Sequence, residues 1–221
     1  MKKVLVIAPH PDDETLGCGG SLLRHKDEGC ELYWLIITKI STKLGWNKEF
    51  VDRRAQEIKN VARAYSFKDV IKLNYPATKI ISSHVPDLVK EIGDLIDKIK
   101  AEIIYAPHIG DVHTDHKYIS NAIESVIKWF RHPSIESFRV YETLSETNFS
   151  FINNNNFYPN YFIDITKYID GKISNAKIYN SEIKDHPFPR SEKAMRSLAT
   201  LRGSQSGFLA AEAFQLVYGR E

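Results

Sequence analysis

The chain alternates between short apolar runs and longer segments in which apolar residues recur at helical spacing. The short runs predict strands, which lie at residues 4–8, 30–38, 70–73, 102–106, 137–142 and 161–165. The longer segments predict helices, which lie at residues 22–28, 48–65, 86–100, 115–130, 166–181 and 191–202. This alternation is typical of an α/β fold with a Rossmann-like, mainly parallel sheet flanked by helices.

The pattern weakens beyond residue 143, where residues 153–156 read as a polar loop. The 221 residues contain no internal repeat and no long linker, and a chain of this length suits one α/β domain. We therefore expect a single domain over residues 1–221 with a less regular C-terminal third at about 143–221. The segments 39–50 and 143–160 are the loops that we expect to select a substrate.

The first polar motif, residues 9–14 (Pro-His-Pro-Asp-Asp-Glu), directly follows the first predicted strand. It therefore lies at the carboxyl edge of the sheet, where open α/β folds bind ligands. The two prolines stiffen the loop, and an imidazole beside adjacent carboxylates suits a divalent cation. The competing interpretation is a turn whose aspartates cap the next helix. Glu14 is interpreted as a first-turn residue or as a partner of the ligands.

The second polar motif, residues 108–116 (His-Ile-Gly-Asp-Val-His-Thr-Asp-His), follows the fourth predicted strand. Because parallel strands end at one edge, the two motifs can meet there. His113 and His116 are three positions apart and fall on one side of a helical turn. Together His10, Asp13 and His116 would supply two imidazoles and a carboxylate, and they would leave a fourth coordination position open, as catalytic zinc sites require.

These motifs resemble those of the PIG-L or LmbE-like metal-dependent de-N-acetylases, and the resemblance spans nearly the whole chain. Residues 54–57 (Arg-Ala-Gln-Glu), 190–191 (Arg-Ser) and 211–214 (Ala-Glu-Ala-Phe) are also similar to family patterns. The resemblance implies an LmbE-like fold and a metal-dependent hydrolase. Such an enzyme would use zinc, or ferrous iron in cells, to remove acetyl from an N-acetylated amino sugar or its conjugate, such as an N-acetylglucosamine conjugate.

The resemblance also implies roles for individual residues, with three metal ligands: His10, Asp13 and His116. Asp12 would be the general base that takes a proton from the activated water. His113, oriented by Asp115 through a ring N–H, would stabilise the oxyanion and, when protonated, could give a proton to the departing amine.

Arg54 is the expected substrate-binding arginine, since its spacing to Glu57 fits the family pattern, and Arg53 is the neighbouring alternative. Four further residues have open roles. Asp111 fits a turn or the site, and His108 fits the pocket or a backbone hydrogen bond. A solvated loop is favoured for His186 and Arg190.

The composition of the chain restricts the class of partner and the cellular compartment that we expect. With 30 basic and 28 acidic residues mixed along the chain, a nucleic-acid partner is not expected. The partner that the resemblance implies is a small molecule. Two cysteines are too few for a disulfide framework, and no apolar run approaches the roughly 20 residues of a membrane span, so we expect a cytoplasmic protein. The oligomeric state stays open, a homo-oligomer included.

Two other functions compete with the deacetylase. A metal-dependent phosphoesterase could use the same kind of edge, usually with more ligands and two ions. A sugar- or metal-binding module without turnover is the non-enzymatic alternative. The glycines in residues 17–20 (Gly-Cys-Gly-Gly) predict close packing of a helix on the sheet rather than a dinucleotide loop.

Overall fold

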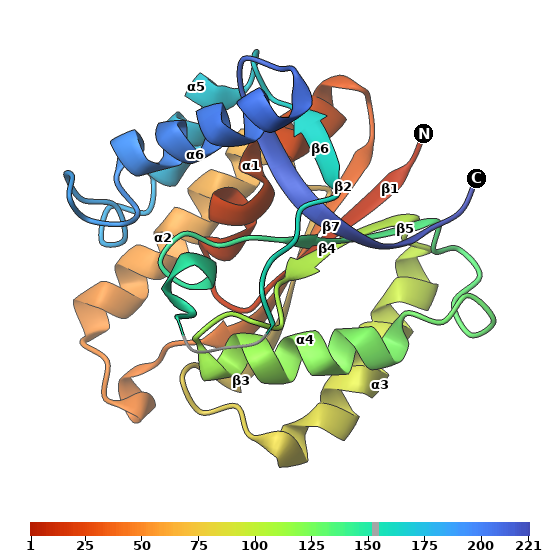
Figure 1. Cartoon of the computed structure of the whole chain (residues 1–221). Coiled ribbons are helices and arrows are strands. Elements are labelled where there is room, and N and C mark those ends of the chain that lie inside the picture. The colour runs from red at the N-terminus through yellow and green to blue at the C-terminus, as the bar shows by residue number, and fades with distance from the viewer. Residues whose placement is uncertain (152–154) are drawn as a thin grey trace.

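The structure is a computed structural model that describes residues 1–151 and 155–221, so part of the expected loop at 153–156 lies outside the described residues. A seven-stranded sheet forms its centre, in the order β3-β2-β1-β4-β5-β7-β6 (Figure 1). The first five strands along the chain pair in parallel; they are β1 (Lys3–Ala8), β2 (Glu31–Lys39), β3 (Asp69–Pro76), β4 (Ile103–Pro107) and β5 (Ser137–Tyr141). The mainly parallel sheet predicted from the sequence is confirmed.

The C-terminal third adds two strands to this sheet. β6 (Tyr161–Asp164) was predicted, whereas β7 (Ala211–Gly219) was not, although it runs antiparallel between β5 and β6. Its apolar pattern is interrupted by Glu212, which is buried in the structure. A charged residue inside a short run hides a strand from a reading based on apolar periodicity.

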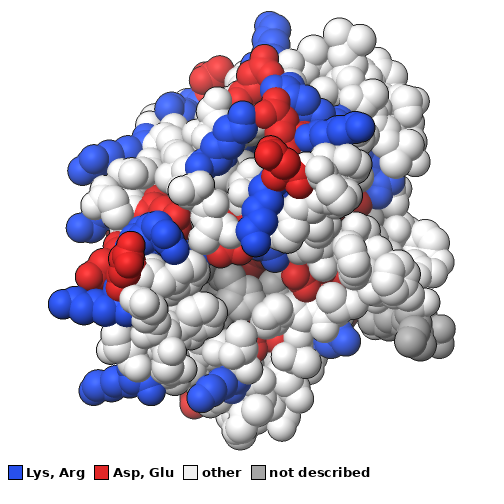
Figure 2. Space-filling view, turned by 90° about the vertical axis from the view of Figure 1, so that its left-hand side faces the viewer, with Lys and Arg blue, Asp and Glu red and all other residues white. Residues whose placement is uncertain are grey.

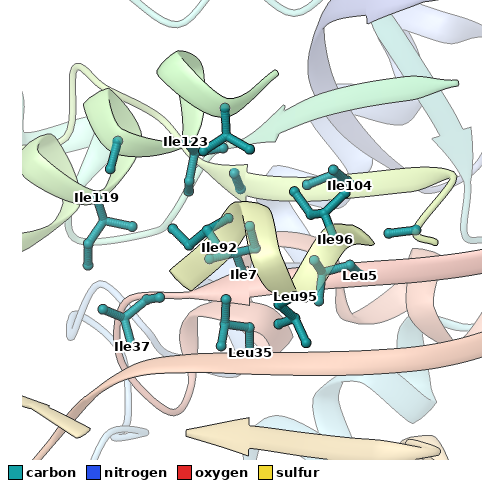
Figure 3. Close-up of a cluster of buried hydrophobic side chains, with 14 of the residues drawn as sticks. Leu5, Ile7, Leu35, Ile37, Ile92, Leu95, Ile96, Ile104, Ile119 and Ile123 are labelled. Carbon is teal, nitrogen blue, oxygen red and sulfur yellow. The ribbon is translucent and has the colours of Figure 1, made fainter. Parts of the chain in front are cut away.

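Helices cover both faces of the sheet (Figure 1). One face carries α1 (Asp13–Asp27), α2 (Lys48–Tyr65), α5 (Ile169–Ala176) and α6 (Glu192–Ser206). The other face carries α3 (Val85–Ile99) and α4 (Thr114–Val126), whose isoleucines pack on the apolar side chains of β1, β2 and β4 (Figure 3). Short 3-10 turns lie at η1 (Thr42–Leu44), η2 (Ser82–His84) and η3 (Thr147–Phe149). Within the described residues, no helix combines the length and apolarity needed to cross a membrane.

α1 packs closely on the sheet, as its glycines predicted. A Cβ added to Gly17 would lie 2.2 Å from a ring carbon of the buried Tyr141, and one added to Gly20 would lie 2.7 Å from the side chain of Ile165. The dinucleotide-loop alternative is therefore unnecessary for these glycines, because the packing itself requires them.

A buried ion pair fixes the middle of α1, where the helix is kinked at Cys18. Beyond the kink, the backbone N–H groups of Gly20 and Ser21 donate to the carboxylate of Glu212, at 2.8 and 2.7 Å. Lys172 donates to the same carboxylate at 2.6 Å. The carboxylate thus satisfies donors that the kink releases from the helix ladder.

We predict that Gly17→Ala destabilises the protein by about 1–3 kcal/mol, because the added methyl group overpacks the Tyr141 ring. Gly93→Ala is the matched control, since it is also helical and its Cβ would approach only the tip of His132, at 3.2 Å. Urea unfolding measures both variants. Equal stability of the two would contradict the packing account.

Candidate metal centre

The two polar motifs meet where the strand order reverses. The chain runs from β1 outward to β2 and β3 and then returns to β4 on the other side of β1. The loops that follow β1 and β4 therefore diverge at the carboxyl edge and leave a crevice, the usual ligand site of open α/β sheets. A cavity of about 400 Å³ lies there and is lined by residues of both motifs. Figure 2 shows this face of the molecule, hollowed near its centre and with acidic atoms visible in the hollow.

Three predicted ligand atoms form a compact triangle at this edge. His10 Nδ1 lies 3.3 Å from His116 Nε2, and Asp13 Oδ2 lies 3.4 Å from the first atom and 3.2 Å from the second. Tetrahedral zinc with bonds of about 2.0–2.1 Å would place two ligand atoms roughly 3.4 Å apart. The triangle therefore has the dimensions that one tetrahedral ion requires.

Each imidazole of the triangle contacts a carboxylate through its second ring nitrogen. His116 Nδ1 lies 2.8 Å from Asp111 Oδ2, and His10 Nε2 lies 3.1 Å from Asp115 Oδ2. An imidazole that donates its second N–H to a carboxylate presents its other nitrogen as a lone pair, which is the usual arrangement in metal sites. Asp111, which the sequence left between a turn and the site, is thus a positioning residue for His116.

The expected role of Asp115 is corrected in part. Its carboxylate contacts His10 rather than the ring of His113, and it is held by the backbone N–H groups of Thr78 and Ile80 at 2.7 and 3.2 Å. Only the backbone N–H of Asp115 reaches His113, donating to Nδ1 at 3.1 Å. The difference arises because residues 78–80 bring donors to the carboxylate from a segment far away in the sequence.

The cluster attracts positive charge. Burial alone would lower the pKa of His10, yet the Asp115 and Asp13 carboxylates raise it to about 9. Burial likewise opposes protonation of His116, but Asp13 and Asp111 hold its pKa well above the ordinary value. Around two imidazoles, three buried carboxylates leave an excess of negative charge that a divalent cation would balance.

His113 lies beside this triangle, with its ring centre 4.5 Å from that of His10. Burial, followed by the charges of His10 and His116, lowers the pKa of His113 to about 4. Because Nδ1 accepts a backbone N–H, the proton of the neutral ring is on Nε2. His10, His113 and His116 also form a set that could hold a metal ion, but Asp13 closes the tighter triangle.

Asp12 differs from the capping residue of the competing interpretation. It has a φ of 140° and its side chain makes no cap to α1. Instead Oδ2 accepts from Arg190 Nη1 at 2.8 Å. Burial raises the pKa of Asp12 to about 7, against the pull of Arg190. The expectation of a solvated loop for Arg190 is therefore wrong, since this arginine reaches 178 positions back along the chain.

Arg54 lines the cavity, whereas Arg53 is exposed. The guanidinium of Arg54 donates to the carbonyl oxygen of Pro11 at 2.6 Å. It also pairs with Glu57 at 3.0 Å and with Glu182. These contacts hold the loop that carries Asp12. A direct contact of Arg54 with the substrate stays a prediction.

The other predicted polar residues lie behind the cavity or away from it. Glu14 is buried and accepts from the backbone of Asp12 at 3.0 Å and from Tyr179 at 2.8 Å, so it supports the loop. His108 contacts the carbonyl oxygen of Asn155 at 3.0 Å, the backbone bond that the sequence allowed. His186 is exposed and lies outside the cavity lining.

A second group with metal-binding side chains lies at the opposite edge of the sheet: His25, Glu28 and Cys30. Glu28 is exposed there and pairs with Arg24 at 2.8 Å. Ordinary contacts account for this group, because His25 lies 2.9 Å from the hydroxyl of Tyr105 and 3.5 Å from Glu28.

We predict that Asp12→Gly is more stable than Asp12→Ala by about 1–3 kcal/mol. Both variants lose the carboxylate, but only glycine adopts a φ of 140° without strain. Thermal unfolding of the pair measures the difference. Equal stabilities would show that the backbone at residue 12 is not strained.

Comparisons with known proteins identify the family of the chain. The PIG-L family model, described as GlcNAc-PI de-N-acetylase, matches residues 5–127. A diacetylchitobiose deacetylase from Thermococcus kodakarensis is 28% identical over 99% of this chain and 84% of its own length.

Solved structures share the fold. The N,N'-diacetylchitobiose deacetylase of Pyrococcus horikoshii superposes with a TM-score of 0.78 at 22% identity, covering 98% of this chain and 84% of its own. A 4-carboxy-2-hydroxymuconate hydratase from Pseudomonas putida gives a TM-score of 0.73 at 18% identity, covering 100% and 98%. The architecture thus carries more than one reaction. The matched segment contains both polar motifs, and the chain belongs to the PIG-L family.

Proposed function

We propose that the protein is a metal-dependent hydrolase that removes the acetyl group from an N-acetylated amino sugar or amino-sugar conjugate. The observation that carries this proposal is the triangle of His10, Asp13 and His116, with a buried carboxylate beside it at residue 12. Family membership and the named activity of the Thermococcus relative support the same reaction.

The residues of the triangle fit a divalent ion as ligands, and zinc is the proposed metal, with ferrous iron as the alternative because both accept these donors. A bound ion there would supply Lewis acidity, lowering the pKa of water and polarising the acetamide carbonyl. Asp111 and Asp115 hold the two imidazoles in the orientation that ligation requires.

Asp12 is the proposed general base. Arg190 engages its Oδ2, which leaves Oδ1 to accept the proton of the attacking water. The pKa of about 7 suits a group that takes up a proton and later returns it to the departing amine. Arg190 orients the carboxylate of Asp12 toward the attacking water, and the carboxylate remains basic.

His113 is the proposed oxyanion donor. Its Nδ1 accepts the backbone N–H of Asp115, so the neutral ring offers the N–H at Nε2 for a hydrogen bond. The low pKa of this residue favours hydrogen bonding by the neutral ring over proton transfer from a charged one. Return of the proton to the amine is therefore proposed for Asp12 rather than for His113.

The two competing functions make different demands. A two-ion phosphoesterase would need a second set of ligands that holds another ion about 3.5–4 Å from the first. Among the described residues, the other metal-binding group lies at the opposite edge of the sheet. A binding module without turnover would have no use for a buried base held by Arg190.

A cytoplasmic location is proposed because the two cysteines are both free.

The test of the proposed function is acetate release from N-acetylglucosamine and from its conjugates, with zinc and with ferrous iron, alongside hydrolysis of phosphate esters. Acetate release that depends on the metal supports the proposal. Phosphate release with two ions per chain would replace it with the phosphoesterase.

We predict that Asp12→Asn keeps the metal and lowers kcat by about 10²- to 10⁴-fold, because the carboxamide cannot take the proton of water. Asp52→Asn, on the outer face of α2, is the control and keeps wild-type turnover. Metal analysis and acetate release are measured on the same samples. An Asp12→Asn enzyme with normal kcat would remove this residue from the mechanism.

His116→Ala should lose both bound metal and activity, since one corner of the triangle disappears. His108→Ala is the matched control, because this buried histidine contacts a backbone carbonyl outside the cavity lining. The metal-to-protein ratio after dialysis separates the two variants. A full complement of metal in His116→Ala would reject the ligand assignment.

A further inference from the structure

Two aromatic side chains on the cavity wall have no role in the chemistry described above. Trp46 and Phe50 both line the cavity that contains the metal-binding triangle. Their rings stack with centres 5.3 Å apart and planes tilted by 16°. Trp46 is 37% exposed, which is high for a residue type that normally buries most of its surface. An aromatic face open to a ligand cavity is a place where a ligand can stack.

The backbone fixes the position of this pair. Gly45 adopts a φ of 90° at the end of η1, and the N–H of Trp46 donates to the carbonyl oxygen of Ser41 at 3.3 Å. Asn47 then caps α2 by accepting from the N–H of Glu49 at 2.8 Å. Phe50 follows within the first turns of the helix. The indole is thus presented by a closed turn and a capped helix.

Charged groups support the stack from the side of α2. The guanidinium carbons of Arg53 and Arg54 lie 5.1 and 5.5 Å from the centre of the Phe50 ring, within range of cation–π attraction. Arg54 also holds the loop of Asp12 through the carbonyl oxygen of Pro11. The aromatic pair and the proposed base are therefore positioned by the same side chain.

Part of the cavity lining is apolar and includes Ile40, Val51, Ala55 and Ile58. The polar side chains of Lys39, Lys72 and Asn74 also line the cavity. This combination suits a saccharide, whose ring has an apolar C–H face and an edge of hydroxyl groups. The cavity of about 400 Å³ also offers more room than a single N-acetylhexosamine fills.

We infer that Trp46 and Phe50 form a stacking subsite for a second pyranose ring, adjacent to the N-acetylhexosamine that is deacetylated. The inference rests on the proposed function for its reacting sugar and names the substrate class as a disaccharide or longer oligosaccharide. A metal ion held by the triangle would engage the acetamide, and the neighbouring ring lies on the indole. Trp46 is then a specificity residue rather than a catalytic one.

The test compares N,N'-diacetylchitobiose with N-acetylglucosamine as substrates of the metal-loaded enzyme. Stacking of one ring is expected to change the ratio of their kcat/KM values by about tenfold. We therefore expect Trp46→Ala to lower the disaccharide-to-monosaccharide ratio about tenfold, mainly through KM, and Trp46→Phe to restore most of it. Trp129→Ala is the matched control, since this tryptophan is 57% exposed and lies outside the cavity lining. An unchanged ratio in Trp46→Ala overturns the subsite.

A binding measurement separates this inference from the proposed reaction. The chain has three tryptophans, and Trp34 is fully buried, so Trp129→Phe leaves Trp46 as the exposed fluorophore. In the Trp129→Phe, Asp12→Asn protein, diacetylchitobiose should change the emission saturably, and the change should vanish when Trp46 is also replaced by Phe. This outcome supports the subsite even if wild-type enzyme releases no acetate, which would refute only the proposed reaction. Saccharide binding with no Trp46-dependent change, or no saccharide binding, overturns the subsite.

Discussion

Parallel pairing of β1 with β4 is the constraint on which the site depends. The two strands are neighbours in the sheet although about 100 residues separate them, so the loops that follow them end within bonding reach of one ion. His10 leaves β1 through a loop stiffened by two prolines, and His116 lies in the first turn of α4. Each imidazole then has a carboxylate behind it. The sheet supplies the approximate placement, and these hydrogen bonds supply the orientation.

The loop after β1 is held in an unfavourable conformation by its surroundings. Asp12 has a positive φ and a buried carboxylate, both of which cost free energy. Arg190 offsets the buried charge, and Arg54 binds the carbonyl oxygen of the residue before it. Both arginines also contact Glu182, so one acidic residue links the two supports. Strain of this kind is expected where a side chain must point at a reacting group rather than cap a helix.

The sequence predicted the sheet, the positions of most elements and the convergence of the two motifs, because strand runs and their following polar residues are local signals. It did not predict β7, whose buried Glu212 breaks the apolar run and pairs with Lys172. It also missed the contact of Arg190 with Asp12 and misassigned the carboxylate of Asp115. These contacts join segments far apart in the chain, and an arginine that follows Pro189 carries no local mark of its partner.

The most direct measurement is a crystal structure of the zinc-loaded protein with anomalous scattering recorded at the zinc absorption edge. The account predicts one peak at the carboxyl edge, about 2.0–2.2 Å from His10 Nδ1, Asp13 Oδ2 and His116 Nε2. It also predicts a fourth position open to solvent beside Asp12. A zinc ion bound by His113 in place of Asp13, or a peak with no protein ligand from the loop after β4, would contradict it.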